Sequence, residues 1–360
     1  STPHAAALSA GGVATYTASA LAVGDHNVSA NYGGDAACAV SASSPLTQTV
    51  YPLDTTTTLD SSPNPSVFGQ SVTFTSTVTS SNGTPTGVVT FTVDSTPHTA
   101  TLSSGVATYS TAALSVGNHN VESEYGGATN YVESVATPIS QTVNQAGTTT
   151  TLISDPNPST WGENVVLTTT VTIVAPGAGI PAGNVTLYRG GATQASGTLN
   201  GSGVMTYATS SLIAATHEFT ASYGGSASFM PSVSATYPQT VSKALSYTTL
   251  TSGPNPSSYG QSVGFTATVT GEATLQPIGI VTFSLSGGGT HVATILDGVA
   301  AYFTSSLSTG IHTATATYGG DSGYAGSVSN GVAQTVNKAS TTTMLTSSEN
   351  PTGLGQSVTF

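Results

Sequence analysis

Histidine is the residue type whose spacing in this sequence most invites a chemical role. Four of the seven histidines recur at matching places of a repeated pattern, at His26, His119, His217 and His312. A metal site would need further ligands at an equally fixed spacing, such as carboxylates or cysteines, and none recurs beside them. Each histidine instead begins an alternating row that ends at a tyrosine, at a corner of the chain. We therefore predict that all four pin this corner structurally and bind no metal.

The string Gly260-Gln-Ser-Val-Gly264 spells the motif G-x-S-x-G, which in some hydrolases presents a nucleophilic serine. That chemistry needs a sharp turn from a strand into a helix, followed later in the chain by an acid and a histidine. The matching places in two other repeats read Gly69-Gln-Ser-Val-Thr73 and Gly162-Glu-Asn-Val-Val166. The serine is replaced by asparagine in one of these repeats and the second glycine is absent from both. Because the repeat can dispense with both residues, we interpret the match as chance and predict no catalytic residue.

Carboxylates could serve glycoside hydrolysis as a pair, or calcium binding as a cluster. Glu122 and Glu124 alternate with an inward row, so we expect both to face solvent. Asp35 and Asp321 follow a recurring Tyr-Gly-Gly word, but the other repeats have alanine or serine there. The sequence thus predicts no catalytic carboxylate pair, no metal and no cofactor.

Four sequons of the type Asn-X-Ser/Thr are candidate acceptors of N-linked glycans. They begin at Asn27, Asn82, Asn184 and Asn200. In a chain so rich in serine and threonine, several sequons are expected by chance. Asn82 lies in a turn that varies between repeats, which makes it the best candidate.

Composition excludes whole classes of function. Three Lys+Arg against fifteen Asp+Glu give a net charge of −12, which opposes binding to nucleic acid and to anionic lipid surfaces. No apolar stretch approaches the roughly 18 residues that a membrane-spanning helix requires. The single cysteine, Cys38, cannot form a disulfide within the chain, and we expect it to be a small buried residue.

Internal repetition sets the domain organisation. The words Tyr-Gly-Gly, Gln-Thr-Val and Asn-Pro each occur four times, always at intervals of 93, 98 and 95 residues. Their first residues are Tyr32, Tyr125, Tyr223 and Tyr318; Gln48, Gln141, Gln239 and Gln334; and Asn64, Asn157, Asn255 and Asn350. The pattern predicts whole modules over 53–146, 147–244 and 245–339, a partial module (back half) over 1–52 and another (front part) over 340–360.

Within a module, apolar and polar residues alternate with a period of two, as in Val72-Thr-Phe74-Thr-Ser76, which is typical of strands. Segments that vary in length between modules, such as Ser80–Gly87 and Asp94–Thr101, are expected to be surface turns. Their counterparts are 173–183 and 271–279 for the first, and 189–198 and 286–294 for the second. About seven short strands per module predict an all-β protein of tandem immunoglobulin-like β-sandwiches.

Several strings together resemble the bacterial Ig-like repeat, group 3. They are Thr55–Leu59, Asn64–Ser66, Gly69–Phe74, Leu114–His119 and Tyr125–Gly127. The resemblance covers nearly the whole chain. It implies the Ig-like fold and the setting of large secreted or surface-anchored proteins, and it implies no catalytic residue.

Short, constant junctions should stack the modules end to end as a rod, and charged residues to guard sheet edges are scarce. We therefore predict a structural extracellular repeat protein that forms a surface stalk or self-assembling fibre or filament, with copies of itself as partners, and not an enzyme. The alternative is an adhesin whose inter-strand turns recognise a cell-surface glycan or a partner protein. Those turns contain mainly small residues, and Trp161 shares its position with Phe68, Tyr259 and Leu354, which indicates packing.

Overall fold

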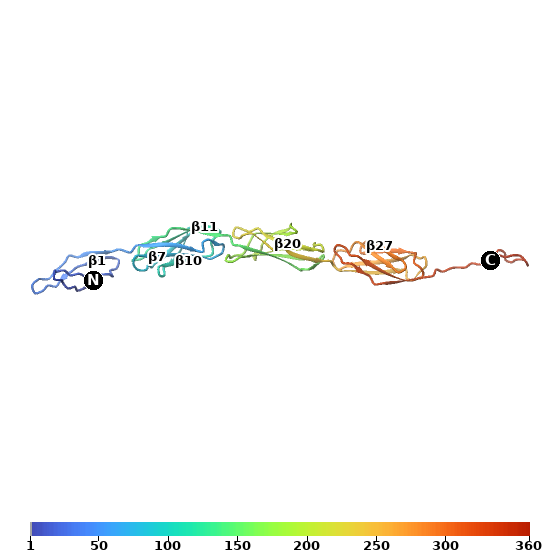
Figure 1. Ribbon diagram of the computed structural model, residues 1–360, viewed down its shortest axis with the longest axis horizontal. Helices are drawn as coiled ribbons and strands as arrows, with labels where there is room; N and C mark the ends of the chain where they lie inside the picture. The colour runs from blue at the N-terminus through green and yellow to red at the C-terminus, as the bar shows by residue number, and fades with distance from the viewer. Residues whose placement is uncertain (1) are drawn as a thin grey trace.

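The computed structural model describes residues 2–360, and every regular element in this range is a strand. Three sandwiches follow one another along the chain, with two incomplete segments before and after them (Figure 1). The predicted all-β architecture of tandem Ig-like sandwiches is confirmed. Within residues 2–360, no helix is long and apolar enough to cross a membrane.

The first sandwich is built from β5 to β13. One sheet has the strand order β10-β7-β5, and the other has the order β6-β13-β11-β8-β9 with the short β12 beside β11. The strands are β5 (Thr55–Ser62), β6 (Ser66–Val67), β7 (Val72–Ser80), β8 (Val88–Val93), β9 (Thr96–Thr101), β10 (Val106–Thr111), β11 (Gly117–Tyr125), β12 (Ser134–Val135) and β13 (Ile139–Asn144). Seven of the nine have six residues or more, which agrees with the expected number of strands.

The second and third sandwiches repeat this topology strand for strand. The second contains β14 (Thr148–Asp155), β15 (Ser159–Thr160), β16 (Val165–Ile173), β17 (Asn184–Arg189), β18 (Ala192–Thr198), β19 (Val204–Thr209), β20 (Thr216–Tyr223), β21 (Ser232–Val233) and β22 (Tyr237–Ser242). The third contains β23 (Ser246–Gly253), β24 (Ser257–Ser258), β25 (Val263–Gly271), β26 (Ile280–Leu285), β27 (Gly289–Thr294), β28 (Val299–Thr304), β29 (Gly310–Tyr318), β30 (Ser327–Val328) and β31 (Val332–Asn337).

Alternation along the strands produces the core between the two sheets. On β7, Val72, Phe74 and Val78 are buried, while the intervening threonines face outward and are partly exposed. Phe91 of β8 and Tyr125 of β11 complete the same core from the opposite sheet. Each sandwich has its own cluster of this kind, so each can bury its apolar side chains without metals or disulfides.

One prediction about turns is wrong. The segment Asp94–Thr101 and its counterparts contain a tight turn and then an edge strand: β9, β18 or β27. In the first sandwich, Asp94 and Ser95 have φ of 45° and 70°, as a two-residue hairpin turn requires. The strand was not foreseen because it lies at a sheet edge, is mostly exposed and contains Pro97, so it lacks an alternating apolar pattern.

The word Tyr-Gly-Gly pins the loop that precedes the central strand of the larger sheet. The hydroxyl of Tyr125 donates to the carbonyl oxygen of Thr86 at 2.6 Å, and Tyr223 does the same to Ala182 at 2.7 Å. The second glycine has φ near +80° in each sandwich, and a Cβ on Gly225 would lie 2.9 Å from the carbonyl oxygen of Phe229. A tyrosine and a left-handed glycine are therefore both required here.

The words Asn-Pro and Gln-Thr-Val meet in space. The side chain of Asn64 donates to the carbonyl of Ser140 at 2.9 Å and accepts from the Thr142 amide at 3.1 Å. These are the two hydrogen bonds that the backbone of a neighbouring strand would make. Gln141 is fully buried and donates to the Pro63 carbonyl at 3.1 Å. The same contacts recur in the other two sandwiches, so these words hold the first segment of each sandwich against its last strand.

The incomplete segments contain less structure. Residues 2–52 form two two-stranded sheets, in which β1 (Gly24–Val28) pairs with β4 (Leu46–Val50) and β2 (Asn31–Tyr32) pairs with β3 (Ser41–Ala42). Residues 340–360 contain no strand. Cys38 was expected to be buried, and this is wrong. Its thiol is free and the residue is exposed, because no second sheet packs over these strands in the described chain.

Candidate functional site

The four recurring histidines lie at the corner where β1, β11, β20 and β29 begin, as the second or third residue of the strand. In each, Nε2 faces the carbonyl oxygen of the residue four positions earlier, at 2.6 to 2.9 Å. His119 and His312 are buried, whereas His26 and His217 are partly exposed. This arrangement is the one that a corner-pinning role needs, and that role remains our proposal for all four.

The buried His119 makes a second contact that the sequence did not reveal. Its Nδ1 lies 2.5 Å from Oδ2 of Asp94, whose Oδ1 accepts the backbone N–H of Asn120 at 3.1 Å. Burial opposes charge on the ring, but the hydrogen bonds to Asp94 and to the Ser115 carbonyl together hold the pKa of His119 above its ordinary value. The hydrogen bond from His119 lowers the pKa of Asp94, and the Asn120 N–H lowers it further.

In the third sandwich a backbone carbonyl replaces this carboxylate. Nδ1 of His312 faces the carbonyl oxygen of Ser286 at 2.8 Å, and Nε2 faces that of Ser308 at 2.8 Å. A neutral imidazole has only one N–H, so only the charged ring donates to both. These two carbonyls raise the pKa of His312, although burial acts against them. Asp94, Arg189 and Ser286 occupy equivalent places, so no recurrence pointed to the carboxylate.

The remaining histidines form a second set that was missed. His98 stacks on Tyr109 with ring centroids 4.1 Å apart, and His291 stacks on Tyr302 at 3.9 Å. The available signal was a tyrosine eleven residues after each of these histidines. His4 stacks on Tyr16 in the same way.

A cleft of about 360 Å³ brings both sets of histidines together in the first sandwich, with Asp94, His98, Tyr109 and His119 among the lining residues. Across residues 2–360, no three His, Cys, Asp or Glu side chains are placed to hold a metal ion. Because His119 and Asp94 are already bonded to each other and to the backbone, they form a structural ion pair in this cleft.

The other candidates are dispersed. Ser262 is exposed and lies directly before β25, so the G-x-S-x-G string leads into a strand. Glu122 and Glu124 are exposed on β11. The four sequon residues are also exposed: Asn27, Asn82, Asn184 and Asn200. Glycan attachment at these residues stays a prediction.

The junctions between sandwiches contain aromatic contacts that were not predicted from the sequence. Phe68, directly after β6, extends from the first sandwich to Phe229 of the second, with ring centroids 5.5 Å apart and planes at 85°. The carbonyl oxygen of Phe68 also accepts the backbone N–H of Ala178 at 3.2 Å. Ala178 belongs to the variable loop after β16, so that loop forms part of the contact.

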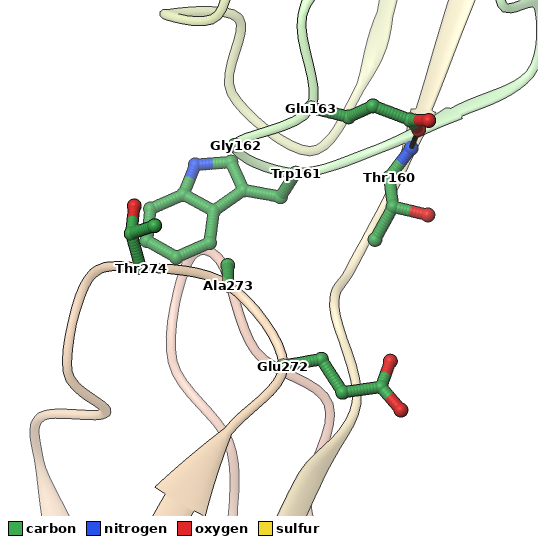
Figure 2. A pocket seen from close by; sticks show the side chains of 7 residues that line it. All are labelled: Thr160, Trp161, Gly162, Glu163, Glu272, Ala273 and Thr274. Carbon is green, nitrogen blue, oxygen red and sulfur yellow. Dashed lines mark hydrogen bonds between the residues drawn. The ribbon is translucent and has the colours of Figure 1, made fainter.

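Trp161 makes the equivalent contact between the second and third sandwiches. Its ring meets that of Tyr324 edge-on, with centroids 5.2 Å apart and planes at 76°. Figure 2 shows the indole lying against the loop that carries Ala273 and Thr274. Trp161, Glu163 and Glu272 are among the residues lining a cavity of about 340 Å³ here. The sequence predicted packing for Trp161, but not that its partner belongs to another module.

Comparison with known proteins shows which family the repeat matches. The model of the bacterial Ig-like domain (group 3) matches residues 1–51, 58–144, 151–242 and 250–337. No curated protein matches the chain.

Solved structures with similar folds include proteins of several kinds. Invasin, a bacterial integrin-binding protein, is 14% identical, and the match covers 72% of this chain and 56% of that one with a TM-score of 0.42. A Ca²⁺-stabilized adhesin with which an Antarctic bacterium binds ice is 17% identical, with coverage of 87% and 81% and a TM-score of 0.31. Fibronectin(III)-like modules of Clostridium thermocellum are 17% identical, with coverage of 52% and 94% and a TM-score of 0.24. At these values the likeness relates the folds alone.

Proposed function

Because the chain belongs to the bacterial Ig-like domain (group 3) family, we propose that it is a structural extracellular repeat protein that forms a rod-like stalk or the unit of a fibre. The observation that carries this proposal is the direct contact between successive sandwiches. Only Gln145, Ala146 and Gly147 separate β13 from β14, and only three residues separate β22 from β23. So short a connection leaves little freedom between neighbours.

The residues between sandwiches are bonded to the sandwich that follows. Ala146 donates to the carbonyl of Ser228 at 3.0 Å, and Ala244 donates to that of Gly323 at 2.8 Å. The side chains of Gln145 and Lys243 also reach the second sandwich's Ser226 carbonyl and the third's Asp321 carbonyl, respectively. A junction with its polar groups satisfied in this way behaves as part of a domain and not as a flexible linker.

We propose no catalytic role for the chain. The histidines are bonded to backbone carbonyls, to one carboxylate or to tyrosines, and the serine of the G-x-S-x-G string is exposed before a strand. Proposed sites of assembly between copies are the edge strands, such as β9, which have unpaired backbone groups and few charges.

The shape of the full chain tests the proposal. Strands of nine residues span about 30 Å, so three sandwiches end to end exceed roughly 90 Å. Small-angle X-ray scattering should give a radius of gyration well above the roughly 21 Å of a compact globule of this length. Electron micrographs should show straight particles, or fibres if copies assemble. A compact particle would overturn the proposal.

One observation favours binding of a partner protein as a second candidate function. The variable loops expose apolar side chains, namely Ile180 at 58%, Leu275 at 61% and Ile278 at 63%. Loops are where proteins carry many of their recognition residues, and two of these side chains, Leu275 and Ile278, lie in the same loop. Changing all three to serine should leave the fold intact and abolish adhesion of beads coated with this chain to cells of its natural surroundings. If native and altered chains adhere equally, this candidate fails.

A further inference from the structure

The two junctions use one geometry with different side chains. The residue directly after β6 or β15 (Phe68 or Trp161) projects from one sandwich to an aromatic residue of the next (Phe229 or Tyr324). That second aromatic always lies six residues after the tyrosine of Tyr-Gly-Gly. The same edge-to-face contact is made at both junctions, by different ring pairs at equivalent positions. We therefore regard it as a recurring feature of the junction between modules.

Small residues around each contact leave room for the projecting ring. A Cβ on Gly323 would lie 2.4 Å from the Trp161 ring, and a Cβ on Gly69 would lie 2.7 Å from the Ala178 backbone nitrogen. A Cβ on Gly179 would lie 3.3 Å from Phe229 and 3.5 Å from Phe68. The two facing surfaces are thus shaped for each other, which is typical of a specific interface.

Both projecting rings pack against a core of the following sandwich, and Trp161 contacts two cores at once. Trp161 packs against the buried clusters of both the second and the third sandwich. Phe68 lies in the first sandwich and packs against the cluster of the second. A side chain that contacts two cores links the stability of both, because undocking one domain exposes apolar surface of the other.

The third sandwich offers the same side chain without a partner ring. Tyr259 follows β24 at the matching position and is 59% exposed. It has no aromatic partner within residues 2–360. This residue provides a natural reference for an undocked position in the same chain.

We propose that Phe68, Trp161 and Tyr259 are docking side chains, and that their partner is the face of a following module of this same kind. Such a module must present an aromatic residue at the position of Phe229 and Tyr324, with small residues beside it. Docking fixes the angle between neighbouring modules and makes the junction between them resist bending. The biological value of this stiffness rests on the proposed rod function, whereas the docking itself is a property of the junction.

The single tryptophan of the chain reports directly on one junction. In the unmodified protein we expect blue-shifted emission from Trp161 and slow quenching by acrylamide. The double variant Trp161→Phe with Phe68→Trp moves the probe to the other junction and should give similar values. The matched control, Trp161→Phe with Tyr259→Trp, should be red-shifted and quenched several-fold faster. Equal quenching in the unmodified chain and in the Tyr259→Trp control would overturn the proposal.

A second measurement addresses stiffness. The angle between neighbouring sandwiches, measured in electron micrographs of single chains, should vary more widely in Trp161→Ala and Phe68→Ala than in the unmodified chain. Tyr259→Ala is the matched control and should leave the distribution unchanged. Circular dichroism identifies any variant that has lost its strands.

The outcomes separate the two proposals. If Trp161 emission is protected but the chain proves to have another biological role, the docking proposal stands and the stalk proposal fails. Unchanged angles in both alanine variants would reject the docking, and straight native particles would still support a rod.

Discussion

Nδ1 of His119 lies 2.5 Å from Oδ2 of Asp94, whereas the equivalent nitrogen of His312 faces a backbone carbonyl at 2.8 Å. The two corners therefore share a histidine but differ in charge. A carboxylate changes its own charge with pH, and a carbonyl does not. The two corners should consequently respond differently to pH.

The first prediction concerns this pH response. The folded pKa of His119 is raised above 6.5, so its contribution to stability is complete below that pH and is lost as pH rises through the folded value. The folded pKa of Asp94 is lowered from 3.8, so its contribution is present above that pH and is lost as pH falls through the folded value. The pair should thus stabilise the first sandwich most between about pH 4 and 6.5.

Hydrogen–deuterium exchange of peptides from β11, corrected for the intrinsic pH dependence of exchange, measures this effect. Protection of β11 should be greatest in that window and fall on both sides. Peptides confined to the His312 end of β29 should lose protection at the alkaline side, because His312 has no carboxylate partner. The other end of this strand is excluded from the comparison, since Tyr318 donates to Asp321, a carboxyl whose pKa is also lowered. Identical pH profiles for the two histidine ends would contradict the assignment.

The second prediction is a substitution of the carboxylate. Asp94→Asn should destabilise the first sandwich by about 0.5–1 kcal/mol at pH 5.5, the scale of a partly exposed ion pair. Half of the Asp94 side chain is exposed, so solvent screens part of the interaction. The acid limb of the pH profile should disappear. Asp60→Asn, an exposed carboxylate on β5, is the control and should change neither.

The sequence predicted the features of this structure that depend on neighbouring residues, and it missed those that depend on residues far apart in the chain. The alternation in β7 is a property of neighbouring residues, and it predicted this strand correctly. The edge strand β9 has no buried face of its own, so no alternation marks it. Asp94 and His119 are 25 residues apart, and their contact depends on how β8 pairs with β11, which no short word records.

The junction shows the same limit at longer range. Trp161 and Tyr324 are separated by more than one whole module, so the equivalence of Trp161 with Phe68 indicated packing without indicating the partner. The second aromatic residue of the contact did have a signal in the sequence, because an aromatic residue lies six positions after three of the four Tyr-Gly-Gly tyrosines. Cys38 occupies that position in the first segment, which obscured the recurrence.

The third prediction compares two adjacent glycines. Gly225 has φ of +81°, and a Cβ there would lie 2.9 Å from the Phe229 carbonyl oxygen. Gly225→Ala should therefore cost about 1–3 kcal/mol. At Gly224 the nearest atom would be 3.7 Å away and φ is outside the left-handed region, so Gly224→Ala should cost well under 1 kcal/mol. Trp161 packs against the cores of the second and third sandwiches, so urea unfolding followed by its fluorescence reports loss of the second sandwich together with this junction. Equal midpoints for the two variants would contradict the argument.

The fourth prediction concerns the buried glutamine. Gln239 is fully buried, and its Nε2 donates to the Pro156 carbonyl and the Ser159 hydroxyl, each at 3.1 Å. Gln239→Ala leaves these groups unpaired beside a cavity and should cost about 2–4 kcal/mol. The neighbouring Thr240 is exposed, so Thr240→Ala provides the control, with a cost near zero. The same urea experiment measures both.

The fifth prediction is the order of tryptic cleavage, because the chain offers only Arg189, Lys243 and Lys338. The peptide bond after Lys243 leads into Ala244, whose N–H and carbonyl are bonded to Gly323 and Ala325. Arg189 closes the paired strand β17. Lys338 follows the last strand and is exposed. Cleavage needs a locally unfolded segment, so trypsin should first cut after Lys338.

Intact-mass measurement over a digestion time course checks this order. The fragment 1–338 should accumulate and persist, and the other two bonds should be cut far more slowly. Trp161→Ala should selectively accelerate the cut after Lys243, because an undocked junction frees Ala244 from its partners. Tyr259→Ala should not have this effect. Early cleavage after Lys243 in the unmodified chain would show that the second junction opens freely, and would contradict docking at this position.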